Sequence, residues 1–334
     1  MATYRDAGVD IEAGNRAVAL ITPLAEATRT PSVLAGVGPF SGLFALEPGR
    51  YTEPVLVAST DGVGTKVLLA SEFGRHTQLG VDLVNHCVND VLTAGADPLF
   101  FLDYVATGAL EPRVVADIVA GMAQACRDAG CALLGGETAE MPGLYAPSTY
   151  DLAGFMVGVC ERRDLIDPSG IEAGDALIAL PSNGLHTNGY SLARKVLPRQ
   201  SLQAPIGGGR TLLDALLEPH RSYLDPVRRL RARLPVKGLA HITGGGVLGN
   251  LPRILPEGTA AEIARGTWPE PQVFSYLAPF VPDAELWRTF NMGLGMIVVI
   301  DAGAVDEALR TLPGDAFHVG RVIGAPAREV SIRE

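Results

Sequence analysis

The segment ASTDGVGTK, residues 58–66, follows the apolar run Val55–Val57. This order predicts a buried strand that stops at a glycine-rich turn, with Asp61 at its end. Gly62 and Gly64 would let phosphate oxygens approach the backbone, and the Asp61 carboxylate would suit Mg²⁺. The alternative from this segment alone is a tight turn in which Asp61 bonds its own backbone.

A second glycine-rich segment with an acid, GGETAEMPG, occupies residues 135–143. Gly135 and Gly136 are expected to end a strand, and Glu137 to leave it as Asp61 leaves its own. The two carboxylates could then converge on one metal cluster. Hard oxygen ligands favour Mg²⁺ over zinc.

A polar stripe follows the helix expected over residues 79–94. Its spacing of i, i+4, i+7 and i+8 puts all four side chains on one face: Asp82, His86, Asn89 and Asp90. A solvated helix face has the same pattern. The other interpretation places Asn89 and Asp90 beside Asp61, where they would share Mg²⁺.

Two further glycine-rich segments could carry chemistry. His186 lies in SNGLHTNGYS, residues 182–191, in an expected strand-to-helix loop where an imidazole can act as acid, base or phosphate partner. A structural histidine fits that position equally well. HITGGGVLG, residues 241–249, offers Gly244 and Gly245 as a phosphate cradle or as a site of close packing. The spacing matches neither a Walker A loop nor a dinucleotide fingerprint, so ATP would require another fold.

Composition excludes several classes of protein. The chain has 334 residues, 47% hydrophobic and 19% charged, with a net charge of −10. This balance predicts a compact α/β protein and argues against a nucleic-acid partner. No apolar run approaches the roughly 20 residues that span a bilayer. The four cysteines form no zinc pattern, so we expect a cytoplasmic protein with reduced thiols.

The chain is long enough for two domains. The charged segment ERRDLIDPSG, residues 161–170, indicates a boundary that gives domains 1–165 and 166–334. Strands are expected at 55–59, 99–105, 132–135, 154–160, 176–180, 239–242, 261–264, 295–300 and 317–323. Helices are expected at 10–28, 79–94, 112–129, 188–197, 222–234, 247–254, 284–290 and 305–312.

In this order, the segments resemble the phosphoribosylformylglycinamidine cyclo-ligase family of purine biosynthesis, almost from end to end. The matching segments are YRDAGVDIEAGN at Tyr4, TDGVGTK at Thr60, CVNDV at Cys87, PLFFLDYVATG at Pro98, GGETAEMPG at Gly135, HTNGYSL at His186, HITGGG at His241 and FNMGLGM at Phe290.

The resemblance implies a two-domain ATP-binding synthetase fold whose N-terminal sheets pair across a homodimer into a barrel, followed by a C-terminal α/β domain. It also implies a reaction. ATP phosphorylates the formamide oxygen of formylglycinamidine ribonucleotide, and the amidine-side nitrogen attacks the activated carbon. Phosphate leaves and the imidazole ring closes. Amide oxygen is a poor leaving group, which is why ATP is needed.

The resemblance assigns roles to particular residues. Metal ligands would be Asp61, Asp90 and Glu137. Catalytic roles would fall to His186, Asp90 and Lys66. The nucleotide would contact Asp61, Gly62, Gly64, Thr65, Asn89, Gly135, Gly136, Glu137, Gly244 and Gly245.

The sequence departs from the family pattern at three places. His86 gains no role from the resemblance and is assigned a structural one. Glu26-Ala27 stands where relatives often have basic residues associated with the nucleotide, and residues 37–41 interrupt a more uniform glycine run.

Two rival functions are disfavoured. A small-molecule kinase of the same superfamily would share the acidic cluster but does not fit the details of the sequence, and the intact acids at Asp61, Asp90 and Glu137 argue against a non-catalytic nucleotide-binding dimer. The homodimer has a physical argument of its own. Strands 55–59 and 99–105 are too apolar to remain exposed, so a partner should cover them, with Phe101 as a candidate contact.

Overall fold

The structure, a computed structural model, describes residues 2–334. The chain forms two compact units, Met1–Asp164 and Leu165–Glu334, which are described separately. The fold is a two-domain mixed α/β arrangement. Among the described residues, no helix combines the length and the apolarity needed to cross a membrane.

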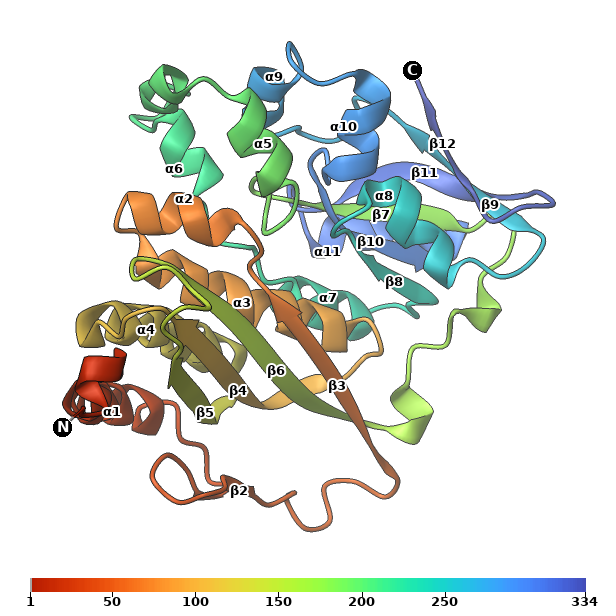
Figure 1. Cartoon of the computed structure of the whole chain (residues 1–334). Helices are drawn as coiled ribbons and strands as arrows, with labels where there is room; N and C mark the ends of the chain where they lie inside the picture. The colour runs from red at the N-terminus through yellow and green to blue at the C-terminus, as the bar shows by residue number, and fades with distance from the viewer. Residues whose placement is uncertain (1) are drawn as a thin grey trace. The chain divides into compact units, whose positions relative to one another are not determined.

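The N-terminal unit is built on a four-stranded sheet (Figure 1). Its strand order is β3 (Pro54–Gly62), β6 (Tyr150–Glu161), β4 (Asp97–Thr107) and β5 (Ala132–Glu140). Strand β6 runs antiparallel to both of its neighbours, whereas β4 and β5 are parallel. The two edge strands are therefore β3 and β5.

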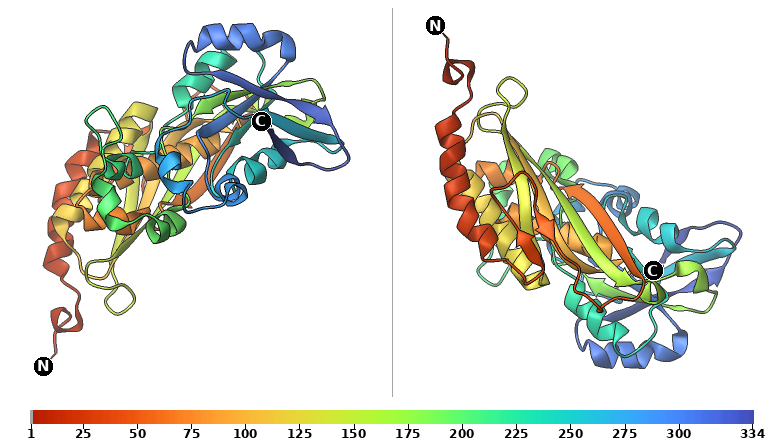
Figure 2. Two further views of the ribbon diagram at one scale, coloured as in Figure 1. Left: turned by 90° about the horizontal axis from the view of Figure 1, so that it is seen from above. Right: turned by 90° about the horizontal axis from the view of Figure 1, so that it is seen from below.

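Helices cover one face of this sheet. They are α3 (His76–Leu92) and α4 (Pro112–Ala129), with α1 (Ile11–Glu26) alongside α4 and the short α2 (Lys66–Glu72) before α3 (Figures 1 and 2). Glycines let α3 and α4 approach closely. A Cβ on Gly80 would lie 2.0 Å from the Ile118 carbonyl oxygen, and one on Gly121 would lie 1.9 Å from that of Thr77.

The opposite face of the N-terminal sheet is apolar and open in the single chain. Leu56 is 60% exposed and Phe155 is 43% exposed. Strand β3 alternates between exposed and half-buried residues, so the expected buried strand at 55–59 is half-covered instead. Strands β1 (Val33–Ala35) and β2 (Leu43–Phe44) cover part of this face near β5 through a small core of Val33, Ala132 and Leu134, against which Phe44, Phe100 and Leu102 pack.

The C-terminal unit contains a six-stranded sheet. Its order is β12 (Val330–Arg333), β9 (Thr259–Ala264), β11 (Phe317–Gly324), β7 (Ala176–Pro181), β10 (Leu294–Ile300) and β8 (Gly238–His241). Every residue of β7, β8 and β10 is buried. Strands β7 and β8 both run antiparallel to β10, so the carboxyl ends of β7 and β8 lie at the same end of the sheet.

The helices of this unit are short. They are α5 (Tyr190–Val196), α6 (Leu212–Leu216), α7 (Leu224–Arg231), α8 (Gly246–Asn250), α9 (Val273–Leu277), α10 (Asp283–Thr289) and α11 (Val305–Thr311). The helix expected over 247–254 is divided, because Pro252 lies in a 3₁₀ turn that follows α8.

Two of the strand ends that differ from expectation carry predicted site residues. Strand β5 continues to Glu140, so Glu137 lies inside the strand instead of leaving it. Strand β3 continues to Gly62, so Asp61 is its penultimate residue. Both strands gain residues from pairing with a neighbour, which short apolar runs do not reveal.

Candidate functional site

Asp61 has two distinct contacts at the end of β3. Its Oδ1 accepts a hydrogen bond of 2.7 Å from the Gly62 N–H, the backbone bond that the simple-turn alternative predicts. Its Oδ2 lies 2.8 Å from His86 Nε2 on α3. The Asp61 side chain remains 39% exposed, whereas that of His86 is 3% exposed. The carboxylate is thus held in place yet open to a ligand.

Asp90 joins this arrangement through Ser59, whose hydroxyl donates to Asp90 Oδ2 over 2.9 Å. Ser59 and Asp61 are two residues apart on β3 and share the face toward α3. His86 and Asp90 are four residues apart on α3 and share a helix face. We call these four residues the β3–α3 acidic site. It places two carboxylates at one helix–strand contact, with one buried imidazole beside them.

The polar stripe on α3 is buried instead of solvated. Asp82 and Asn89 are fully buried and His86 nearly so. Asp82 forms an ion pair with Lys66, whose Nζ lies 2.8 Å from Asp82 Oδ2, and both side chains are 0% exposed. Lys66 is the first residue of α2, and its ammonium neutralises a buried acid. This contact supports a structural role for Lys66.

Replacing Lys66 with methionine should therefore destabilise the N-terminal unit, because it leaves Asp82 buried without its counter-charge. Breaking a buried pair in this way costs about 3–5 kcal/mol. Thermal unfolding would measure the loss. The double variant Lys66→Met/Asp82→Leu should recover most of it, since no charge then remains buried. A double variant that is stable but no longer binds ATP would assign Lys66 to the nucleotide instead.

Glu137 lies far from the β3–α3 acidic site within one chain. Asp61 pairs in register with Gly154, Gly154 with Asp103, and Asp103 with Gly136. Three strand spacings separate the two edges of the sheet, about 14 Å. Glu137 follows Gly136, so its side chain points to the other face. The expected convergence of Asp61 and Glu137 on one metal does not occur within a single chain.

Of the two glycines before Glu137, Gly136 makes room for Asp103. A Cβ on Gly136 would lie 2.2 Å from Asp103 Oδ1, whereas Gly135 has only ordinary contacts. Burial, together with a smaller contribution from the negative charge of Glu137, raises the pKa of the Asp103 carboxyl to about 7. Asp103 is thus an acid that can hold its proton near neutral pH.

A large cavity opens beside these acids. Its volume is about 920 Å³, which is the size of a site for a nucleotide or drug-sized ligand. One wall is the glycine-rich loop that precedes β2, and the other is the open face of the sheet. The lining includes Gly36, Gly38, Gly42, Phe100, Leu102, Asp103, Tyr104, Gly135, Gly136, Glu137 and Phe155.

The remaining nucleotide candidates of the N-terminal unit flank Asp61. Gly64 is exposed and has a φ of +54°, a conformation that glycine adopts readily. Thr65 occupies the N-cap position of α2 and is half-buried. Asn89 is fully buried one residue before Asp90. Gly62, Gly64 and Thr65 therefore lie next to the half-exposed carboxylate along the chain.

His186 is buried in the loop between β7 and α5, with 1% exposure and a φ of +61°. A positive φ is uncommon for a residue with a side chain and marks a loop held by its surroundings. Its ring stacks on that of His220, with centroids 3.9 Å apart. Sequence reasoning treated His186 as a lone histidine, but the fold gives it a histidine neighbour.

Close packing accounts for one residue of the glycine run after β8. Gly246 permits close packing, because a Cβ there would lie 2.1 Å from the Trp287 carbonyl oxygen. Gly244 and Gly245 are exposed. The Asn250 side chain donates to the Gly244 carbonyl over 3.1 Å and so stabilises the turn. The exposed pair remains available to a ligand.

Sequence reasoning missed three contributors to these sites. His86 was assigned a structural role, although it lies on the stripe that contains Asp90. Ser59 could have been found from its position two residues before Asp61. Asp103 carries no local signal, because its burial depends on Gly136 in a neighbouring strand.

Comparison with known proteins places both units in one family. Residues 47–160 match the family described as AIR synthase related protein, N-terminal domain, and residues 172–333 match its C-terminal domain. The phosphoribosylformylglycinamidine cyclo-ligase of Myxococcus xanthus is 57% identical, over 96% of this chain and 95% of that protein. The cyclo-ligase of Carboxydothermus hydrogenoformans is 50% identical over 99% of each.

Solved structures share the fold at much lower identity. The crystal structure of E. coli HypE aligns with a TM-score of 0.69 at 19% identity, covering 95% of this chain and 93% of that one. A hydrogenase maturation protein HypE in complex with ATP aligns with a TM-score of 0.66 at 18% identity, covering 92% and 88%. At this identity the likeness concerns the fold alone.

Proposed function

The chain belongs to the phosphoribosylformylglycinamidine cyclo-ligase family, and from this premise we propose that it closes the imidazole ring of aminoimidazole ribonucleotide in de novo purine biosynthesis. The substrate is formylglycinamidine ribonucleotide, and ATP is converted to ADP and phosphate. The observation that carries this proposal is a relative of that name at 57% identity over nearly the whole chain. The placement of two carboxylates at one strand–helix contact, with Asp61 held by His86 and Asp90 held by Ser59, supports it.

The reaction runs in two steps. The formamide oxygen attacks the γ-phosphorus of ATP, and ADP leaves. The amidine-side nitrogen then attacks the activated carbon, the C–O bond breaks, and inorganic phosphate leaves with the oxygen. The protein must hold the triphosphate in line with the formamide and exclude water, because hydrolysis would waste the activated intermediate.

The donor set of the β3–α3 acidic site fits Mg²⁺. It supplies two carboxylates, one of them 39% exposed. Oxygen ligands of this kind are those that Mg²⁺ takes alongside substrate phosphates. When bound, the ion would neutralise part of the charge on the triphosphate. Asp61 is oriented by the Gly62 N–H and His86, and Asp90 by Ser59, so both carboxylates are positioned before the nucleotide arrives.

We assign roles to the other sequence-predicted residues by their surroundings within each unit. Gly62, Gly64 and Thr65 flank Asp61, and Gly244 and Gly245 form an exposed turn. In this proposal each segment binds phosphate oxygens of a ligand through its own backbone N–H groups. His186 acts as acid or base for the ring-closing nitrogen when its imidazole binds no metal ion. Glu137 and the two glycines before it belong to the large cavity on the open face of the sheet.

In a homodimer, Glu137 of one chain could act together with the acids near Asp61 of its partner. Glu137 and Asp61 lie on opposite edges of one sheet, but two sheets joined through their open faces would give each chain access to its partner's edge. The exposed Leu56 and Phe155 support this arrangement, because a monomer would leave a large apolar face in water.

The proposed activity has a direct test. Purified protein with Mg²⁺, ATP and formylglycinamidine ribonucleotide should form aminoimidazole ribonucleotide, ADP and phosphate in equal amounts. Thiamine monophosphate serves as the substrate of a rival kinase activity. Turnover of that compound without any ring closure would overturn the assignment. ATP binding without turnover of either compound would indicate a non-catalytic dimer.

A further inference from the structure

Three buried histidines meet at one edge of the C-terminal sheet. His241 is the last residue of β8, and His186 lies in the loop that follows β7. Both strands pair with β10, which brings their carboxyl ends to the same edge. His220 comes from the segment between α6 and α7. The cluster is therefore assembled by the fold from three segments distant in sequence.

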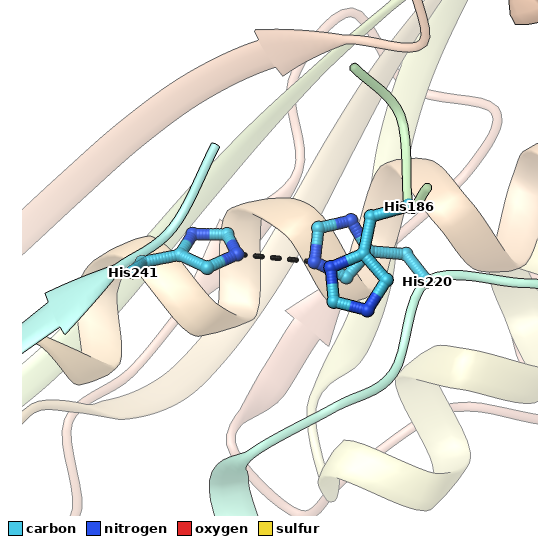
Figure 3. Close-up of side chains that lie close together, drawn as sticks. All are labelled: His186, His220 and His241. Carbon is cyan, nitrogen blue, oxygen red and sulfur yellow. Dashed lines mark hydrogen bonds between the residues drawn. The ribbon is translucent and has the colours of Figure 1, made fainter. Parts of the chain in front are cut away.

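The imidazoles face one another closely (Figure 3). The Nε2 atoms of His220 and His241 are 3.0 Å apart. The ring of His186 stacks on that of His220 with an interplanar angle of 20°. One nitrogen from each of the three side chains lies within 4.8 Å of the other two. The exposed fractions are 1% for His186, 1% for His220 and 5% for His241.

We propose that His186, His220 and His241 form a binding site for a zinc-type transition-metal ion. Neutral imidazole nitrogen is a good ligand for Zn²⁺ and a poor one for Mg²⁺. Three histidines that leave a fourth position open are a recurrent zinc ligand set. The site is distinct in its chemistry from the carboxylates of the β3–α3 acidic site.

The observed distances need only modest adjustment. Zn–N bonds of about 2.0–2.1 Å in tetrahedral geometry place two ligand nitrogens about 3.3 Å apart. The His220–His241 pair is already within a few tenths of an ångström of that spacing. His186 must rotate its ring off the stack to direct a nitrogen at the ion.

A second polar group supports the orientation of His220. Its Nδ1 lies 3.5 Å from the Thr187 hydroxyl, which leaves Nε2 directed at His241. Metal-binding histidines commonly use the nitrogen away from the metal for such a contact, and this contact fixes the ring. Zn²⁺ held by the two neutral imidazoles would replace the hydrogen bond between the Nε2 atoms, and the proton of that bond would move to the other ring nitrogen or to solvent.

The inference does not rest on the proposed function, because metal binding can be measured without substrate or ATP. The full-length protein, stripped with a chelator and dialysed, should take up one Zn²⁺ per chain from a solution of the metal alone. Co²⁺ in its place should give the visible absorption of a tetrahedral nitrogen-ligated ion. A wild-type protein that shows neither retained Zn²⁺ nor this Co²⁺ spectrum would overturn the proposal.

Variants identify the ligands. His220→Asn and His241→Gln should each weaken Zn²⁺ binding by at least about 100-fold, since loss of a direct ligand should exceed the 10–100-fold effect of losing an outer partner. The matched control is His318→Asn, which removes an exposed histidine of the same unit and should bind like wild type. Zn²⁺ should raise the Tm of the wild type and of this control, but not that of His220→Asn. Equal affinity in all four proteins would place the metal elsewhere.

Discussion

Replacing Asp61 with asparagine should lower the rate of ring closure by about two orders of magnitude or more, the usual cost of removing a major electrostatic contribution to the transition state. The side chain keeps its size, and its remaining oxygen can still accept the Gly62 N–H. What it loses is the negative charge at the half-exposed edge of the β3–α3 acidic site. Asp90→Asn should behave similarly, because its oxygen can still accept from Ser59.

Stability should separate this effect from misfolding. Both substitutions relieve repulsion between neighbouring carboxylates, so the Tm of each variant should stay near or above that of the wild type. Asp128→Asn is the matched control, because it removes the same charge from an exposed position on α4. Steady-state assays at saturating Mg²⁺ and ATP would compare the three variants. Near-normal turnover in both Asp61→Asn and Asp90→Asn would show that these acids have only structural roles, in the turn and in the helix.

The sequence predicted regular elements well where their pattern was long. The helix over 112–129 matches α4 at both ends, and each expected strand overlaps an observed one. Short elements such as α2, α6, α9 and β12 were missed, because four to seven residues carry too little periodicity to stand out. Strand ends depended on partners, as β5 shows by continuing through Gly135 and Gly136 to Glu140.

Some contacts within the candidate site could be predicted from the sequence, and others could not. The placement of Asp61 and Asp90 at one strand–helix contact followed from packing α3 on the sheet, and in the structure His86 contacts Asp61 while Ser59 contacts Asp90. The ion pair of Lys66 with Asp82 could not be predicted, since burial of a lysine depends on packing around the whole helix. The approach of His220 to His186 joins separate loops and has no signature in local spacing.

A second substitution with a large expected effect lies on the open face of the N-terminal sheet. Arginine at Phe155 should convert a homodimer into monomers or aggregates with little activity. Phe155 pairs in register with Leu102 on β4 and with Thr60 on β3, so it lies at the centre of the face, and it is 43% exposed. A charge there would have to be desolvated on assembly, which is costly without a counter-charge.

Phe101 is the wrong position for this test, although the apolar strand suggested it. Its side chain is fully buried on the helix-covered face, where a Cβ on Gly154 would lie 2.3 Å from Phe101 Cζ. Arginine at this position would disrupt the core of the unit whether or not a dimer forms. Successive side chains of β4 point to opposite faces of the sheet, so Phe100 and Leu102 face the open side whereas Phe101 faces the helices.

The matched control is Phe280→Arg, which places the same charge on a phenylalanine that is 51% exposed in the C-terminal unit. Light scattering at micromolar concentration should find dimers for the wild type and for this control, and monomers or aggregates for Phe155→Arg. Activity should fall with assembly, because Asp61 and Glu137 occupy opposite edges of one sheet and would need a partner to share a nucleotide. A well-folded Phe155→Arg monomer with full activity would show that one chain completes the site alone, and the role of Glu137 would then have to be reassigned.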